Sequence, residues 1–181
     1  LCSFRAPAAD GKRIAVIGSG PAGRGAAAVL AQNGHRVTVF EQHKRAGGMM
    51  NVIPDVRLGK QVVRKDIQFL KGLGAIEFKT GWAVAEPEAL LKEFEAVIVC
   101  AGLQEPVPLG IPGEELALSW QEYLQDPRAL SVAGKWVAVF GGGAVAVDCA
   151  TTAKRRGARL GELVYRRRQQ DMPLTGYERQ M

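Results

Sequence analysis

Short apolar runs alternate along this chain with longer segments that have the features of helices. Uninterrupted apolar runs are typical of strands that are buried on both faces of a parallel sheet. They predict strands at 14–17, 37–40, 97–100, 137–140 and 163–165. Apolar residues at helical spacing, alanine-rich stretches and terminal Pro and Gly residues predict helices at 25–33, 58–72, 87–94, 119–124 and 145–156. This alternation predicts an α/β fold with parallel sheets.

Four glycines recur at a fixed spacing. Gly11, Gly18, Gly20 and Gly34 each lie 123 residues before another glycine, at positions 134, 141, 143 and 157. The spacing indicates a duplicated strand–turn–helix unit and not a short-period solenoid. We therefore expect two Rossmann-like units. A lead segment at 1–10 would be followed by a first domain at 11–116 and a second domain at 117–181.

Each copy contains a glycine-rich turn between a strand and a helix. Such a turn offers backbone N–H donors without an obstructing side chain, and the helix dipole adds positive potential, so it suits a pyrophosphate. Its glycines allow a tight turn, a close approach of the phosphates and close packing of the helix on the strand. The predicted contacts are Gly18, Gly20, Pro21, Ala22 and Gly23 in the first copy, and Gly141, Gly143, Ala144 and Val145 in the second. The alternative is a glycine turn of an unrelated α/β protein.

The two copies differ after their second strand. Glu41 ends that strand in the first copy, where a carboxylate accepts hydrogen bonds from ribose hydroxyls and repels a 2′-phosphate. This predicts FAD or NAD(H) at the first site. Arg166 and Arg167 occupy the corresponding place in the second copy, and two guanidinium groups favour a 2′-phosphate. This predicts NADP(H) at the second site, with solvated surface arginines as the alternative.

Composition narrows the classes of partner. The net charge is +6 and much of it surrounds the second glycine turn, so the phosphate of a dinucleotide explains it more simply than nucleic acid does. No apolar run approaches the roughly 20 residues that span a bilayer, and residues 1–10 lack the features of a signal peptide. We therefore expect a cytoplasmic protein with neither a membrane nor a nucleic-acid partner.

The cysteines suggest no metal or dithiol site. Cys2, Cys100 and Cys149 include no CxxC pair, and the two histidines cannot complete a zinc site. Cys100 and Cys149 lie in apolar segments, which predicts buried thiols that behave as small hydrophobes. The odd number of cysteines favours a reducing compartment.

Taken together, these residues resemble the pyridine nucleotide-disulphide oxidoreductase superfamily. Within it, the sequence resembles the small subunit of glutamate synthase, the flavin domain of dihydropyrimidine dehydrogenase and the large subunit of NADH-dependent ferredoxin:NADP oxidoreductases. The resemblance covers nearly the whole chain from Gly11 on. It rests on both glycine turns, on Glu41, on an Arg-x-Gly-Gly turn at 45–48, on an Ile-Pro…Arg-Leu segment at 53–60 and on a Tyr-Arg-Arg…Met-Pro segment at 165–173.

The resemblance implies further contacts with an FAD. They are Gln42, Arg45, Gly47, Gly48, Ile53, Pro54, Ala101 and Gly102. Two of these segments depart from the family pattern, because Gly59 stands where the family usually has Pro and Ala101 stands where it has Thr.

The resemblance also implies an enzyme module that passes hydride between NADPH and FAD, with no side chain as a catalytic residue. Only Cys2 precedes the first turn, where the family carries a cysteine-rich domain, so electrons would be relayed to or from iron–sulfur clusters on another domain or subunit of a hetero-oligomer. The chain begins with Leu and ends soon after Met172-Pro173, so we expect an incomplete second domain. The alternatives are a non-catalytic dinucleotide-binding module of a larger complex and a nucleic-acid-binding Rossmann-like domain.

Overall fold

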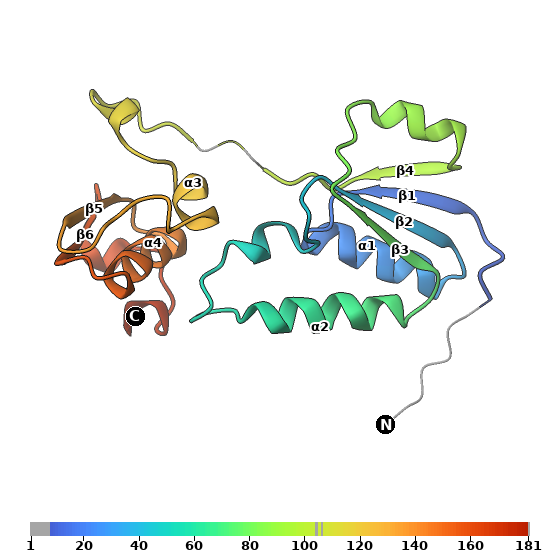
Figure 1. Ribbon diagram of the computed structural model, residues 1–181, viewed down its shortest axis with the longest axis horizontal. Coiled ribbons are helices and arrows are strands. Elements are labelled where there is room, and N and C mark those ends of the chain that lie inside the picture. Colours follow the sequence, from blue (N-terminus) through green and yellow to red (C-terminus); the bar gives the residue numbers. More distant parts are fainter. Residues whose placement is uncertain (1–7, 104, 106, 181) are drawn as a thin grey trace. The chain divides into compact units, whose positions relative to one another are not determined.

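The computed structural model describes residues 8–103, 105 and 107–180. Its internal contacts divide the chain into two compact units (Figure 1). Of the described residues, unit 1 contains those up to 51 together with 55–103, and unit 2 contains Val52–Pro54 together with those from 105 on. The sequence suggested a boundary near 116, because the turn-rich stretch around Pro108 and Pro112 has no apolar pattern that assigns it to either side.

Unit 1 is built on a four-stranded parallel sheet in the order β3-β2-β1-β4. Its strands are β1 (Arg13–Ile17), β2 (Arg36–Glu41), β3 (Ile76–Thr80) and β4 (Ala96–Val99). Its helices are α1 (Pro21–Gln32) and α2 (Lys60–Lys71), with short 3-10 helices at Gly48–Asn51 and Pro87–Lys92. In Figure 1, α1 and α2 lie on the same side of the sheet.

The core of unit 1 follows from the alternation of side chains along each strand. On the helix side, the buried residues are Val16, Ala27, Ala31, Val37, Val39, Leu70, Leu73 and Ile76. On the opposite side, Ala15 and Phe40 pack against Phe94, which follows the 3-10 helix Pro87–Lys92. Because β1 and β2 contribute to both clusters, their uninterrupted apolar runs predicted them correctly.

Strand β3 was not predicted. Its sequence Ile-Glu-Phe-Lys-Thr alternates apolar and polar residues and contains no apolar run. The reason is its position at the edge of the sheet, where Phe78 packs against the core while Glu77 is exposed. An edge strand needs one buried face only, so a search for uninterrupted runs misses it.

Unit 2 contains a two-stranded parallel sheet formed by β5 (Trp136–Phe140) and β6 (Leu160–Val164). Its helices are α3 (Trp120–Gln125) and α4 (Ala144–Arg155), with 3-10 helices at Glu114–Leu116, Gln169–Asp171 and Glu178–Gln180. Helix α3 begins with a capping box, in which Ser119 and Glu122 bond to each other's backbone N–H. The core lies between α3, α4 and β5 and includes Tyr123, Val132 and Cys149.

The two units repeat the same backbone hydrogen bonds, which confirms the internal duplication. The N–H of Gly11 donates to the C=O of Gly34 at 3.0 Å, and Gly134 donates to Gly157 at 2.8 Å. At the other end of the strand pair, Gly18 donates to Phe40 at 2.8 Å and Gly141 donates to Val164 at 2.9 Å. These bonds make Tyr165 the structural counterpart of Glu41, because each follows the residue whose carbonyl bonds to the first glycine of the turn.

None of the helices in the described part of the chain combines the length and the apolar character required to span a membrane.

Candidate dinucleotide-binding sites

The first glycine turn joins β1 to α1 and depends on the absence of side chains. Gly18 has a φ of 100°, and a Cβ there would lie 2.3 Å from the carbonyl oxygen of Cys100. A Cβ on Gly23 would lie 1.9 Å from the carbonyl oxygen of Gly18. By contrast, a Cβ on Gly20 would meet nothing within 4 Å, so the backbone at Gly20 has open space beside it. Pro21 and Ala22 follow as the first exposed residues of α1.

Glu41 lies at the end of β2, is only 4% exposed and is held by bonds from within the protein. Its Oε2 accepts the N–H of Ser19 at 3.2 Å and also the Ser19 hydroxyl, and its Oε1 accepts the N–H of His43 at 2.9 Å. The hydroxyl of Ser19 in turn accepts the N–H of Gly47 at 2.8 Å. Three of the roughly four lone-pair directions of the carboxylate are therefore used. Sequence reasoning missed Ser19, although it stands in the middle of the Gly-x-Gly triplet.

The loop after β2 folds back onto the turn. Gly47 and Gly48 have φ values of 126° and 55°, and a Cβ on Gly48 would lie 2.8 Å from the Cα of Gly20. The side chains of Gln42 and Arg45 are exposed on this loop. Among the described residues, the guanidinium of Arg45 makes no ion pair and no hydrogen bond, so it is free to meet an anion.

The segment after β4 reaches the same place. The N–H of Cys100 donates to the carbonyl of Ile17 at 2.7 Å, which continues the pairing of β4 with β1. Ala101 and Gly102 follow as exposed residues, and Gly102 has a φ of 75°. Three predicted segments therefore meet at the carboxyl ends of β1, β2 and β4: the turn 18–23, the loop 42–48 and residues 101–102. Ile53 and Pro54 belong to unit 2 by their contacts.

The second glycine turn joins β5 to α4. Gly141 has a φ of 142°, and a Cβ on Gly143 would meet nothing within 4 Å. Gly143 is the N-cap of α4, so Ala144 and Val145 form its first turn. The open space beside Gly143 matches that beside Gly20. Both turns therefore fit the phosphates of a dinucleotide, which need close backbone N–H groups and no side chain in the way.

The loop after β6 fixes one arginine and leaves two free. Arg168 donates to both carboxylate oxygens of Asp171, at 3.0 and 3.3 Å. The hydroxyl of Tyr165 donates to the backbone carbonyl of Asp171 at 3.3 Å. Arg166 and Arg167 are exposed, and neither makes an ion pair or a side-chain hydrogen bond within the described ranges. Two unpaired cations thus stand directly after the counterpart of Glu41.

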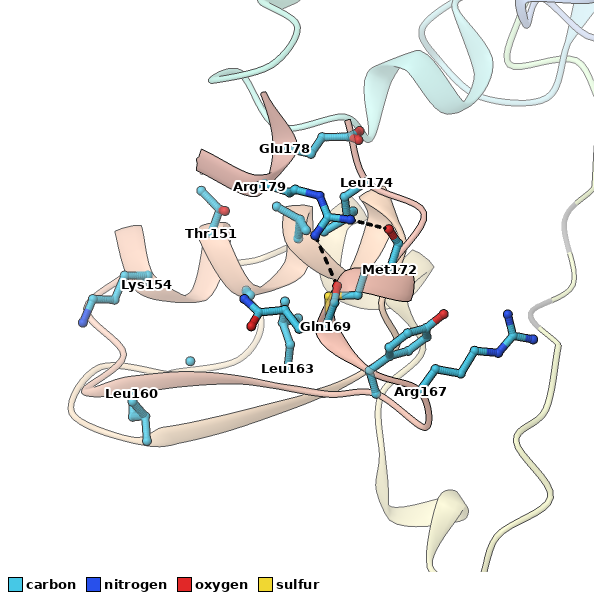
Figure 2. A pocket seen from close by; sticks show the side chains of 14 residues that line it. Thr151, Lys154, Leu160, Leu163, Arg167, Gln169, Met172, Leu174, Glu178 and Arg179 are labelled. Atoms are coloured by element: carbon cyan, nitrogen blue, oxygen red, sulfur yellow. Dashed lines mark hydrogen bonds between the residues drawn. The ribbon is translucent and has the colours of Figure 1, made fainter. Parts of the chain in front are cut away.

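A cavity of about 740 Å³ runs along α4 and β6 (Figure 2). Its wall on α4 consists of Val147, Ala150, Thr151 and Lys154. Opposite them, Arg179 holds the chain by donating to the carbonyls of Gln169, Gln170 and Met172 at 3.2, 3.3 and 2.9 Å. Figure 2 shows Arg167 at the edge of the cavity with its guanidinium directed away from Arg179. This cavity was not predicted, although its α4 residues recur at helical spacing.

The buried cysteine of unit 2 is not a reactive thiol. Burial, and secondarily the carboxylate of Asp148, raises the pKa of Cys149 to about 12. The thiol is therefore protonated at neutral pH, and a protonated thiol is a poor nucleophile. Cys100 is partly buried against the core of unit 1. Cys2 lies outside the described residues.

The sequence pattern of the pyridine nucleotide-disulphide oxidoreductases matches residues 12–176, which spans both glycine turns. The chain belongs to this family. The predicted resemblance is thus confirmed, and so are the cofactors FAD and NAD(P)H, which this family uses and which both turns fit.

Two curated relatives illustrate the relationship. The chain is 41% identical over 179 residues to the beta subunit of NADP(+)-dependent formate dehydrogenase from Moorella thermoacetica, covering 93% of this chain and 25% of that protein. It is 38% identical over 167 residues to the NADPH glutamate synthase small chain from Bacillus subtilis, covering 82% of this chain and 34% of that protein. The chain therefore spans about a quarter to a third of the length of these relatives.

Solved structures confirm the α/β fold. A mutant of FprA from Mycobacterium tuberculosis superposes with a TM-score of 0.78 at 22% identity, covering 92% of this chain and 46% of that one. Thioredoxin reductase from Lactococcus lactis gives a TM-score of 0.66 at 22% identity, covering 94% and 60%. At these identities the likeness establishes the fold alone.

Proposed function

We propose that this oxidoreductase module passes hydride between NADPH and FAD. One observation carries the proposal: two turns with the same backbone bonding are followed by opposite charges, Glu41 in unit 1 and Arg166 with Arg167 in unit 2. When bound, the nicotinamide and the flavin supply the hydride chemistry, so the protein needs no side chain as an acid or base. Its residues bind and orient the two nucleotides.

In unit 1, the FAD would be held by the segments at the carboxyl ends of β1, β2 and β4. The backbone from Gly18 to Gly23 would receive the pyrophosphate in the open space beside Gly20. The remaining acceptor direction of Glu41 would take a ribose hydroxyl. The further contacts proposed are Gln42, Arg45, Gly47, Gly48, Ile53, Pro54, Ala101 and Gly102.

In unit 2, the NADPH would be held by the turn at Gly141–Val145 and by the two free arginines. The turn offers the same open backbone at Gly143, and the residue directly after β6 is Tyr165, which carries no carboxylate to repel a 2′-phosphate. Arg166 and Arg167 would pair with that phosphate, because guanidinium groups bind phosphate oxygens through several N–H donors at once.

Electrons would then leave or reach the module through another redox centre. The high pKa of Cys149 argues against a thiol of unit 2 as that centre. We propose iron–sulfur clusters on another domain or subunit, in the cytoplasm. The names of the two relatives support an assembly of several chains, since one is a beta subunit and the other a small chain.

The test is an anaerobic titration of the FAD-loaded chain with NADPH and with NADH, followed by the visible absorbance of the flavin. We expect bleaching by NADPH and much slower bleaching by NADH. Arg166→Ala combined with Arg167→Ala should weaken NADPH and leave NADH unchanged. Equal loss for both nucleotides would show that the arginines do not bind the 2′-phosphate, and failure to bind FAD would overturn the flavin assignment.

A non-catalytic dinucleotide-binding module is the second candidate, because both glycine turns offer open backbone for phosphates whether or not hydride passes between the nucleotides. In that case the chain would bind both nucleotides, and the flavin absorbance would not change on addition of NADPH.

A further inference from the structure

In unit 1, the middle residue of the glycine turn contacts the residue that ends the second strand through hydrogen bonds. These residues are Ser19 and Glu41, and both the N–H and the hydroxyl of Ser19 donate to Glu41 Oε2. The contact holds a carboxylate beside the turn. The structural counterparts in unit 2 are Gly142 and Tyr165.

In unit 2, the corresponding two residues are in van der Waals contact. A Cβ on Gly142 would lie 2.5 Å from Cδ2 of Tyr165 and 2.7 Å from its Cγ and Cε2. The ring therefore lies directly against the glycine backbone, and no side chain fits between them. Because Cγ is also this close, rotation about χ2 alone would not clear the ring, and a swing about χ1 would take the hydroxyl away from the carbonyl of Asp171.

The far end of the ring is also fixed. The Tyr165 hydroxyl donates to the backbone carbonyl of Asp171 at 3.3 Å, and the carboxylate of Asp171 binds Arg168. The ring thus spans from the glycine turn to the loop that carries the arginines. It offers no anionic group at the place where unit 1 has a carboxylate.

We propose that Gly142 and Tyr165 act as a pair that determines nucleotide selectivity at the second site. The proposal rests on the proposed function, in which this site binds NADPH. The ring fills the place of a carboxylate with a neutral surface and holds the loop so that Arg166 and Arg167 face the 2′-phosphate. Gly142 is required because any side chain there would displace the ring. Both residues select and position the nucleotide and neither takes part in hydride transfer.

The experiment exchanges the pair for that of unit 1. A variant with Gly142→Ser and Tyr165→Glu reproduces Ser19 and Glu41 at the second turn. Calorimetric titration of the purified chain with 2′,5′-ADP and with 5′-AMP, which lacks only the 2′-phosphate, measures the affinity ratio and needs no flavin. We expect the wild type to prefer 2′,5′-ADP. The exchange should lower the ratio about tenfold or more, because a carboxylate then faces the 2′-phosphate.

Two matched variants distinguish a loss of selectivity from a general loss of affinity for both probes. Gly143→Ala places a methyl group beside the 5′-phosphate that both probes share, so it should weaken both and leave the ratio unchanged. Tyr165→Phe keeps the ring and removes only the bond to Asp171, so it should keep most of the preference. If Tyr165→Phe lost the preference as fully as the exchange, the hydroxyl and not the Gly142–Tyr165 contact would set selectivity, and the proposal would be wrong.

The outcomes are distinguishable. A wild type that prefers 2′,5′-ADP, with an exchange variant of unchanged ratio, overturns the pair and leaves the proposed function standing. A wild type with no preference overturns both. If circular dichroism shows that the exchange variant is unfolded, Tyr165→Glu alone decides the matter by the same ratio, because it leaves Gly142 without a side chain.

Discussion

Units 1 and 2 have the same glycine turn but differ at its third position, which is Gly23 in one and Ala146 in the other. In unit 1, a methyl group at the third position would lie 1.9 Å from the Gly18 carbonyl oxygen, so only Gly23 fits. In unit 2, the side chain at that position is the methyl group of Ala146, which helix α4 accommodates. The third glycine is therefore a requirement of close packing between helix and strand and not of the turn itself.

The helices also differ in what packs against one of their faces. Arg24, Ala27, Ala28 and Ala31 of α1 pair with or pack beside α2 and β3. The α4 residues that lie 123 positions later are Val147, Ala150, Thr151 and Lys154, which line the cavity. The turn is therefore specified locally by its glycines, whereas the packing against its helix depends on elements that come later in the chain.

The largest effect is expected from a substitution that disrupts the close packing of helix and turn in unit 1. Gly23→Ala should lower the free energy of unfolding by about 3 kcal/mol, because the methyl group overlaps the Gly18 carbonyl. The matched control is Gly25→Ala in the same helix, where a Cβ meets nothing within 4 Å. It should raise stability by about 0.5–1 kcal/mol. Urea denaturation measures both, and equal stabilities would contradict the packing argument.

A second effect tests the ion pair that joins α1 to α2. Arg24 is 6% exposed and its guanidinium pairs with Asp66, which is half exposed. Asp66→Ala should cost about 2 kcal/mol, because it leaves a buried cation without a partner. Arg24→Val, which copies Val147, should restore most of this loss in the double variant. A double variant no more stable than Asp66→Ala would show that the loss of stability does not come from an unpaired buried cation.

The third and smallest expected effect is a pH dependence of the free energy of unfolding that arises from a thiol of unit 2. Cys149 has a folded pKa of about 12, and its counterpart in unit 1 is Ala26. Above about pH 9 the unfolded thiol loses its proton first, so stability falls as pH rises towards 12, by at most about 1.4 kcal/mol per pH unit. Cys149→Ala should reduce this slope. Urea denaturation at pH 8, 9 and 10 measures it, and an unchanged slope would assign the effect to other groups.

The sequence predicted those strands and turns that have a clear local pattern, either an apolar run or a glycine motif. Strands β1, β2, β4 and β5 were found from apolar runs, and both turns were found from their glycines. The start of β6 was missed because Leu160-Gly161-Glu162 is not an apolar run, and β3 was missed because an edge strand buries one face only.

The site was predicted less completely than the fold, because its contacts join distant residues. Glu41 and the arginines stand out by charge and position. Their partners do not, since Ser19 and Gly142 are ordinary turn residues until the strand pairing brings Glu41 and Tyr165 beside them. Only geometry shows that one contact is a hydrogen bond and the other a ring against a glycine.

The pairing of the strands has a consequence for hydrogen exchange. Strand β1 is bonded on both sides, to β2 and to β4, so its amides reach solvent only when unit 1 opens as a whole. Strand β5 is bonded to β6 alone among the described residues, which leaves one of its edges without a strand partner. Amides on that edge would exchange through local fluctuations, so the two turns, alike in bonding, rest on strands that open on different timescales.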